Sequence, residues 1–223
     1  MKLFIQNKYH EGGAREYQTA GNNLPCLSAY CEMRVSLLHI MDILIVVDMQ
    51  KDFVDGSLGT QEAQNMVPNL VQIIAAHNGP IIATLDTHAE NYMDTSEGKH
   101  LPVPHCIKGT DGWQLDHRIE KALKDRESDT KVLYLEKPTF GSVRLPDIIK
   151  GMAAGRDFSL SFTGLCTDIC VISNALLLKA HFPEVPMKVL ADCCAGVTPE
   201  KHEAALDVMA SCQIEVVRGN RYV

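Results

Sequence analysis

The stretch Ile43-Leu44-Ile45-Val46-Val47-Asp48 decides the fold. Its five consecutive apolar residues, four of them β-branched, end at a carboxylate. Such a run is typical of a strand that is buried on both faces. Comparable short runs recur along the chain and alternate with stretches of helical periodicity. The predicted strands are 43–47, 80–85, 131–135, 158–163, 187–191 and 214–217, and the predicted helices are 68–77, 113–123, 147–152, 167–179 and 199–210.

Continuous apolar strands joined by helices indicate a parallel sheet with helices on both faces. The sequence therefore predicts the α/β class, with a three-layer α/β/α domain built on a six-stranded parallel sheet. We expect this domain to cover residues 41–223. Residues 1–40 lack the alternating pattern, and we expect them to be a poorly ordered N-terminal extension or sequence upstream of the true start codon.

Composition excludes several classes of protein. The chain has 223 residues, 46% of them hydrophobic and 22% charged, which is ordinary for a globular protein and disfavours disordered, collagen-like and coiled-coil structures. The net charge of -7 disfavours nucleic acid and anionic membranes as partners. Because the sequence contains neither a bilayer-length apolar run nor a secretory signal, we expect a cytoplasmic protein whose eight cysteines are mostly free thiols.

Reactive side chains stand at the ends of successive predicted strands. Asp48, Asp86, Lys137 and Cys170 each have a bland structural explanation when taken singly, but parallel strand ends converge in space. A thiol near a base and a cation supports nucleophilic attack by thiolate, with Asp48 as the base and Lys137 as the cation. Cys166 lies in the same loop, and spacing alone leaves open which of the two thiols reacts.

The long connection after the second predicted strand holds several metal-ligating side chains. Connections of this length inside a compact domain are usually functional. Asp86 and His88 point to the same side of an extended segment, and His105 supplies a second imidazole. This set suits Zn, Fe or Mn with water in the open positions. His100 and Cys106 are further candidates of lower rank.

Five motifs carry a resemblance to a known family. They are Val47-Asp48-Met-Gln-Lys-Asp52-Phe53, Asp86-Thr-His88, Pro102-Val-Pro-His105-Cys106-Ile-Lys-Gly109-Thr, Glu136-Lys137-Pro and Thr163-Gly-Leu-Cys166-Thr-Asp-Ile-Cys170-Val. Over residues 42–217 the chain is similar to nicotinamidases, which are pyrazinamidase-like members of the isochorismatase-like cysteine hydrolase superfamily. The resemblance implies the isochorismatase-like fold and places the nucleophile at Cys170, with Asp48 and Lys137 completing a catalytic triad.

The resemblance also implies a divalent metal and an oxyanion hole. The metal would be held by Asp86, His88 and His105, with Glu97 acting directly or through water. A non-proline cis peptide before Cys166 would turn the amides of Cys166 and Cys170 toward the oxyanion. Candidate aromatic walls of the substrate pocket are Phe53, Trp113 and Phe140.

The function implied is hydrolysis of nicotinamide to nicotinate and ammonia through a cysteine thioester, in NAD salvage. The partner would be a small amide, and a homo-oligomeric state stays open. The alternative is another small-amide or carbamoyl hydrolase of the same superfamily. An isochorismatase is disfavoured by Cys170 and the metal set. A nucleotide-binding or scaffold module is disfavoured because neither G-x-G-x-x-G nor G-x-x-x-x-G-K-[ST] occurs in the expected places.

Overall fold

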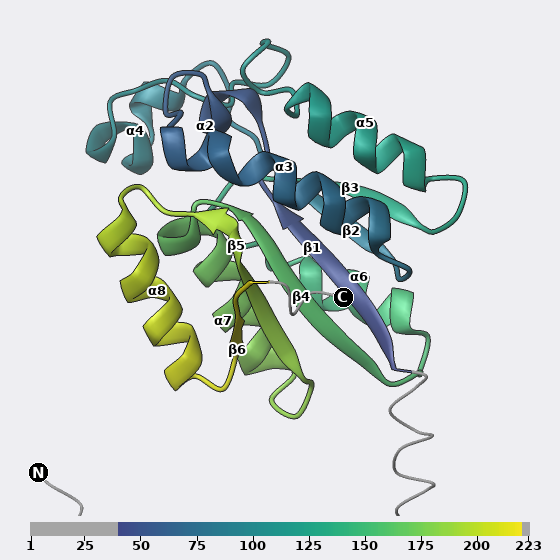
Figure 1. Ribbon diagram of the computed structural model, residues 1–223. Coiled ribbons are helices and arrows are strands. Elements are labelled where there is room, and N and C mark those ends of the chain that lie inside the picture. The colour runs from purple at the N-terminus through teal and green to yellow at the C-terminus, as the bar shows by residue number, and fades with distance from the viewer. Residues whose placement is uncertain (1–39, 220–223) are drawn as a thin grey trace, which may run out of the picture. The chain divides into compact units, whose positions relative to one another are not determined.

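The computed structural model describes residues 40–219, which form a six-stranded parallel sheet in the order β3-β2-β1-β4-β5-β6 (Figure 1). The predicted extension lies outside the described residues, apart from its last residue. The strands are β1 (Met41–Val47), β2 (Ile81–Asp86), β3 (Val132–Lys137), β4 (Phe158–Leu165), β5 (Met187–Ala195) and β6 (Glu215–Val217). The helices are α2 (Lys51–Val54), α3 (Gln61–Ala76), η1 (Tyr92–Asp94), α4 (Ser96–His100), α5 (His117–Arg126), α6 (Leu145–Ala153), η2 (Thr167–Val171), α7 (Ile172–His181) and α8 (Pro199–Ser211).

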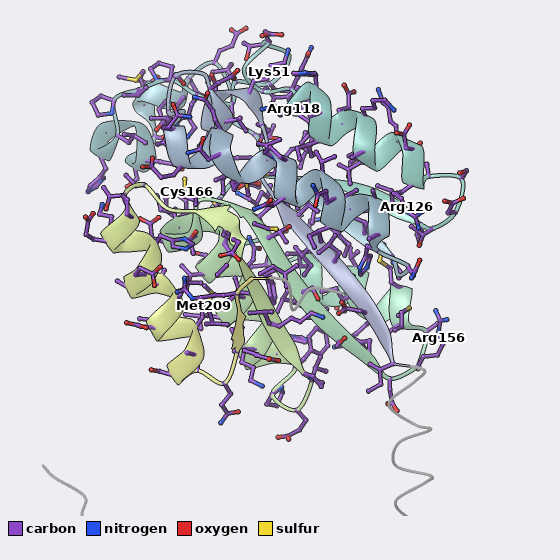
Figure 2. All side chains as sticks on the ribbon, viewed as in Figure 1. Lys51, Arg118, Arg126, Arg156, Cys166 and Met209 are labelled. Carbon is purple, nitrogen blue, oxygen red and sulfur yellow. The ribbon has the colours of Figure 1, made fainter. Side chains whose placement is uncertain are left out.

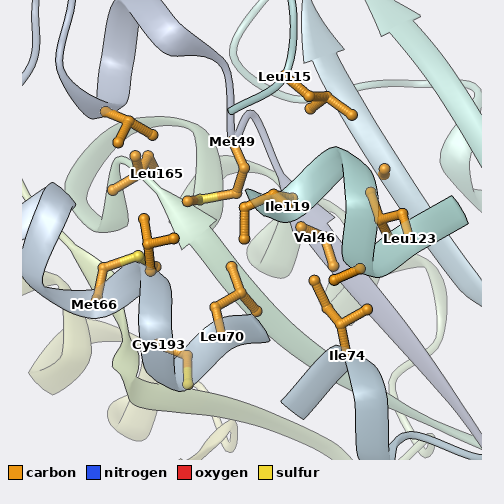
Figure 3. Close-up of a cluster of buried hydrophobic side chains, with 14 of the residues drawn as sticks. Val46, Met49, Met66, Leu70, Ile74, Leu115, Ile119, Leu123, Leu165 and Cys193 are labelled. Carbon is orange, nitrogen blue, oxygen red and sulfur yellow. The ribbon is translucent and has the colours of Figure 1, made fainter. Parts of the chain in front are cut away.

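Helices cover both faces of the sheet, as the continuous apolar strands predict. Figure 1 shows α3 and α5 on one face and α6, α7 and α8 on the other. Successive residues of a strand point to opposite faces, so β1 contributes to two cores. Leu44 and Val46 pack under α3 and α5, in the cluster drawn in Figure 3, whereas Ile43, Ile45 and Val47 pack against α6 and α7. The predicted three-layer α/β/α fold is confirmed.

The six predicted strands are confirmed, but three of the five predicted helices begin several residues away from their predicted starts. α3 begins at Gln61 rather than residue 68, because Thr60 caps it by accepting a hydrogen bond from the amide of Ala63. α5 begins at His117 rather than residue 113, with Asp116 as its cap. The helix predicted from residue 167 opens instead as the π-helical turn η2.

The order of the strands places a crevice at one edge of the sheet. From β1 the chain builds outward through β2 and β3, then returns to the other side of β1 to build β4, β5 and β6. Sheets of this order bind ligands outside the carboxyl ends of the strands, where the order reverses. That point lies between the carboxyl ends of β1 and β4. No helix among the described residues is long and apolar enough to cross a bilayer.

Leu70 tests the packing of α3 on the sheet. Its side chain is fully buried in the core of Figure 3. We expect Leu70→Ala to lower the free energy of unfolding by about 2–5 kcal/mol, because the cavity left behind adds to the lost burial. The exposed neighbour Gln72 provides the control, since Gln72→Ala should change it by less than about 0.5 kcal/mol. Urea unfolding of both variants checks this, and similar values for the two would contradict the packing described.

Candidate active site and metal centre

Asp48 follows β1 and is held in place by β2. Its backbone adopts a φ of 48°, and its amide donates to the carbonyl of Thr84 at 3.1 Å. The hydroxyl of Thr84 donates to Oδ1 of Asp48 at 2.7 Å. Gly164 of β4 pairs with Val47, and a Cβ at this glycine would lie 2.1 Å from the carbonyl oxygen of Val47. The carboxylate is therefore fixed in a fully buried position where β1, β2 and β4 meet.

Lys137, the last residue of β3, gathers the reactive groups. Its Nζ atom lies 2.7 Å from Oδ2 of Asp48 and 3.2 Å from Oδ1 of Asp86. The same ammonium donates to the carbonyl of Thr139 at 3.0 Å and to Sγ of Cys170 at 3.5 Å. Its side chain is fully buried. The three residues predicted to form a triad are thus brought together around one ammonium.

Cys170 lies on η2, directly after β4. The peptide bond between Leu165 and Cys166 is cis, as the resemblance implies, and the carbonyl of Cys166 accepts from the amide of Val171 at 3.1 Å. Asn174, one turn further along, donates to the carbonyls of Cys170 at 2.8 Å and Phe140 at 3.1 Å. The nucleophile candidate is therefore tied both to the end of β4 and to the loop that follows Lys137.

Burial and the neighbouring charges shift the pKa values of the groups in this cluster. It raises the pKa of the Cys170 thiol well above its usual value, and the negative charge of Asp48 adds to this effect while Lys137 opposes it. Burial also raises the pKa of Asp48, against the charge of Lys137. For Lys137 itself, burial alone would lower the pKa, but Asp48, Cys170 and Asp86 outweigh it and raise the pKa. The resting site thus favours a neutral thiol beside a charged ammonium, with Asp48 a stronger base than an exposed carboxylate.

The contacts of the two nearby cysteines differ. Cys166 is half-buried at the carboxyl edge of the sheet, where Figure 2 labels it, and burial raises its pKa to about 12. Cys170 is the thiol that lies within reach of the Lys137 ammonium. The geometry therefore favours Cys170 as the nucleophile, in agreement with the resemblance. All cysteines in the described part of the chain are free thiols, as the sequence predicts for these residues.

Four candidate metal ligands converge beside this cluster. One ligand atom from each of Asp86, His88, Glu97 and His105 lies within 4.8 Å of the others. Oδ2 of Asp86 lies 2.9 Å from Nε2 of His88 and 3.6 Å from Nε2 of His105. Oε1 of Glu97 lies 3.6 and 3.7 Å from the same two nitrogens. Donor atoms around a tetrahedral ion with bonds near ~2.1 Å lie roughly 3–4 Å apart, so the cluster suits one small cation.

The orientation of the imidazoles also suits a metal. Nδ1 of His105 lies 2.8 Å from the carbonyl of Val103, and a hydrogen bond there puts the proton on Nδ1 and frees Nε2 to bind a metal. Nε2 of His88 is buried, and since its 2.9 Å contact with Oδ2 of Asp86 lacks the geometry of a hydrogen bond, it has no hydrogen-bond partner among the described residues. Burial alone would raise the pKa of Asp86, but His105, His88 and Lys137 outweigh it and hold that pKa well below its usual range. Asp86 is therefore ionised, as a metal ligand must be. For His105, burial alone would lower the pKa, but the contact with Asp86 outweighs it and raises the pKa, so metal binding at Nε2 would release a proton.

Local backbone pairing accounts for the convergence of residues far apart in sequence. A parallel bridge joins His88 to Ile107, with the amide of His88 donating to the carbonyl of Cys106 at 3.0 Å. This bridge brings His105 beside His88, with ring centroids 5.0 Å apart. Glu97 arrives on α4, whose cap Thr95 accepts from the amide of Gly98. Neither His100 nor Cys106, the lower-ranked candidates, belongs to the cluster.

Sequence reasoning missed two side chains that support the site, the buried Gln50 and the half-buried Asp52. Gln50 binds both backbone groups of Asp86: its Oε1 accepts from the amide at 2.7 Å, and its Nε2 donates to the carbonyl at 2.8 Å. Asp52 accepts from the amide of Cys106 at 2.8 Å, which fixes the start of the His105 loop from the β1 side. The Val47–Phe53 motif contained the signal for both, since its polar residues follow a buried strand.

The two thiols of the η2 turn and the four candidate metal ligands open onto a cavity of about 870 Å³. Phe53 and Phe140 line it, as predicted, but Trp113 does not. The indole of Trp113 packs against the α3 side of the core, and its Nε1 donates to Oγ1 of Thr87 at 2.9 Å. The prediction that Trp113 lines the pocket is therefore wrong. Other lining residues include Leu58, Thr60, Ala63, His100, Leu101, Ile169, Gly196, Val197 and Lys201.

Comparison with curated proteins finds three relatives. The uncharacterized isochorismatase family protein PncA of Bacillus subtilis is 30% identical over 174 residues, which cover 75% of this chain and 93% of the relative. A probable inactive nicotinamidase of Arabidopsis thaliana is 26% identical over 175 residues, covering 72% and 84%. The nicotinamidase/pyrazinamidase of Mycobacterium tuberculosis is 25% identical over 193 residues, covering 79% and 98%.

Solved structures with the same fold include three amidases. The nicotinamidase/pyrazinamidase PncA of Bacillus subtilis superposes with a TM-score of 0.69 at 25% identity, covering 80% of this chain and 100% of that one. The pyrazinamidase of Pyrococcus horikoshii in complex with zinc gives 0.61 at 26%, covering 80% and 99%. The N-carbamoylsarcosine amidase of Thermoplasma acidophilum gives 0.63 at 25%, covering 82% and 98%. The isochorismatase domain model matches residues 42–220, and the chain therefore belongs to the isochorismatase family.

Proposed function

We propose that this protein is an amidohydrolase that converts nicotinamide to nicotinate and ammonia through a thioester on Cys170. The observation that carries the proposal is the position of the Lys137 ammonium, 2.7 Å from the Asp48 carboxylate and 3.5 Å from the Cys170 sulfur. Family membership and the names of the relatives from Mycobacterium tuberculosis and Bacillus subtilis support an amide substrate. A base, a cation and a thiol in contact are the parts that nucleophilic amide hydrolysis requires.

Proton transfer from the thiol begins the reaction. Asp48 is the proposed acceptor of the Cys170 proton, because its Oδ2 contacts the same Lys137 ammonium that lies 3.5 Å from the sulfur. The resulting thiolate attacks the amide carbonyl and forms a carbon–sulfur bond. Lys137 remains an ammonium throughout and offsets the negative charge that passes between the carboxylate and the sulfur.

Collapse of the tetrahedral intermediate releases ammonia. The amides of Cys166 and Cys170 are the proposed donors to the oxyanion. Asp48 returns its proton to the leaving nitrogen as the carbon–nitrogen bond breaks, which leaves an acyl thioester on Cys170. A water molecule then gives a proton to Asp48 and its hydroxide to the thioester carbon. The thiolate leaves, recovers the proton from Asp48 and restores the resting site.

The cluster of Asp86, His88, Glu97 and His105 is the proposed holder of a divalent metal, with Zn, Fe and Mn all suited to these ligands. When bound, such an ion supplies a Lewis acid that can anchor the ring nitrogen of a pyridine amide. Asp86 links this cluster to the catalytic residues, because its Oδ1 contacts Lys137 while its Oδ2 faces the imidazoles.

One different substrate class has a specific observation in its favour. The structure resembles an N-carbamoylsarcosine amidase about as well as it resembles the zinc-bound pyrazinamidase, with TM-scores of 0.63 and 0.61. The second candidate is therefore hydrolysis of carbamoyl compounds by the same cysteine chemistry.

We further propose that residues 41–223 form the catalytic domain and that the protein acts in the cytoplasm, in salvage of pyridine nucleotides.

Cys170→Ala tests the covalent mechanism. Since loss of one member of a catalytic unit typically costs several orders of magnitude, we expect kcat/KM for nicotinamide to fall by about 10⁴-fold or more, measured as ammonia release. The exposed Cys212 offers a matched control, and Cys212→Ala should retain the wild-type rate. An alanine variant at position 170 that keeps its rate would refute thioester catalysis, and a wild type inactive on every amide would refute the proposed function.

Metal binding can be measured without turnover. We expect the chelated protein to bind about one zinc ion in calorimetric titration, and His88→Ala and His105→Ala to weaken binding by about tenfold or more through loss of a ligand. His100→Ala is the control, because His100 lies in the same loop but outside the cluster. Equal losses in all three variants, or no zinc binding by the wild type, would contradict the assignment of the metal site.

A further inference from the structure

The cavity is larger than a one-ring amide requires. Its volume of about 870 Å³ lies toward the upper end of the ~300–1,000 Å³ typical of pockets that enclose drug-sized ligands. The thiol and the metal-ligand cluster account for part of its wall. Another part comes from the segment between β5 and α8, through Gly196 and Val197, and from Lys201 in the first turn of α8. Figure 1 shows this segment and α4 on the same flank of the molecule.

Lys201 is a cation in this wall, and it forms no ion pair with a carboxylate of the described residues. Its side chain is exposed, and among residues 40–219 no carboxylate lies within ion-pair distance of its Nζ atom. Lys137, the other ammonium that reaches the reactive groups, is paired with both Asp48 and Asp86. In a chain with a net charge of -7, the charge of Lys201 is thus available to an anion inside the cavity.

The position of Lys201 in its helix gives no structural reason for a cation. Lys201 lies in the first turn of α8, where its amide donates to Oγ1 of the capping residue Thr198 at 3.3 Å. The first turn of a helix favours acidic side chains and disfavours basic ones, because the helix dipole is positive there. Glu200 meets that preference and Lys201 opposes it. The ammonium therefore does not stabilise α8, and within the described part of the chain it forms no ion pair with another element.

We infer that Lys201 is a specificity-determining residue that binds a carboxylate of the substrate. The inference rests on the proposed amide hydrolysis and extends it to primary amides and carbamoyl compounds whose far end is anionic. One ammonium with no arginine beside it in the cavity wall suits a singly charged carboxylate. The apolar side chains of Leu101, Phe140 and Val197 would cover the atoms between the scissile group and this carboxylate.

A pair of substrates that differ only in charge tests the inference. N-carbamoylglycine carries a carboxylate, its methyl ester is neutral, and both release ammonia by the proposed reaction. We expect the wild type to prefer the carboxylate, and Lys201→Met to lower the ratio of the two kcat/KM values about fivefold, through KM. Lys201→Arg should retain the ratio, and added salt should lower it in the wild type but not in Lys201→Met.

Lys131 provides a matched control, because it is exposed and precedes β3 at the opposite end of the sheet. Lys131→Met should leave the ratio at its wild-type value. An unchanged ratio in Lys201→Met, or a wild type that hydrolyses nicotinamide but not N-carbamoylglycine, would overturn the inference and leave the proposed function intact. Calorimetric titration of Cys170→Ala with both compounds tests the same preference without turnover, and equal binding of the two would also overturn it.

Discussion

The buried ammonium of Lys137 is the interaction on which the rest of the site depends. A charge in a fully buried position requires partners of opposite sign, since an unpaired ion in the interior costs several kcal/mol. Lys137 has two such partners, Asp48 and Asp86, which end β1 and β2. Because the ammonium comes from β3 and also reaches Cys170, one cation joins three strand ends to the turn after β4. The edge of the sheet is therefore held together by the groups that would perform the chemistry.

The same contacts couple the candidate catalytic cluster to the candidate metal centre. Asp86 directs one carboxylate oxygen toward Lys137 and the other toward His88 and His105. Gln50 binds both backbone groups of Asp86, so this carboxylate has little freedom to leave either cluster. A change in the charge at the candidate metal centre would therefore change the electrostatic potential at Lys137 and, through Lys137, at the Cys170 thiol. The two clusters behave as one electrostatic unit rather than as neighbouring sites.

Much of this arrangement follows from the sequence, because strand ends are easy to locate. The run from Ile43 to Val47 is apolar without interruption, so its end at Asp48 is unambiguous, and parallel strands bring Asp86 and Lys137 to the same edge. The residues that line the cavity could not be predicted in the same way, because their positions depend on contacts between distant segments. Trp113 is aromatic, as pocket walls often are, but its indole N–H donates to Thr87 and its half-buried ring packs against the core.

The starts of the helices and the outer wall of the cavity could not be predicted from the sequence for a similar reason. α3 begins well before its amphipathic pattern becomes clear, because the cap at Thr60 decides where the helix starts. Lys201 belongs to a helix whose sequence gives no hint of a ligand, and its place in the cavity appears only when α8 packs beside η2. Local patterns therefore predict the strands and the residues at their ends, whereas the shape of the cavity requires the folded chain.

The central claim is that the thiol held by Lys137 and Asp48 forms a covalent bond with the substrate. Acid quenching of the protein during nicotinamide turnover, followed by peptide mass spectrometry, tests this most directly. The account predicts an acyl adduct on the peptide that contains Cys170, lost when Cys170→Ala is used and retained in Cys166→Ala. An adduct that persists in Cys170→Ala and disappears in Cys166→Ala would contradict it, since the reacting sulfur would then be the one outside the Lys137 contact.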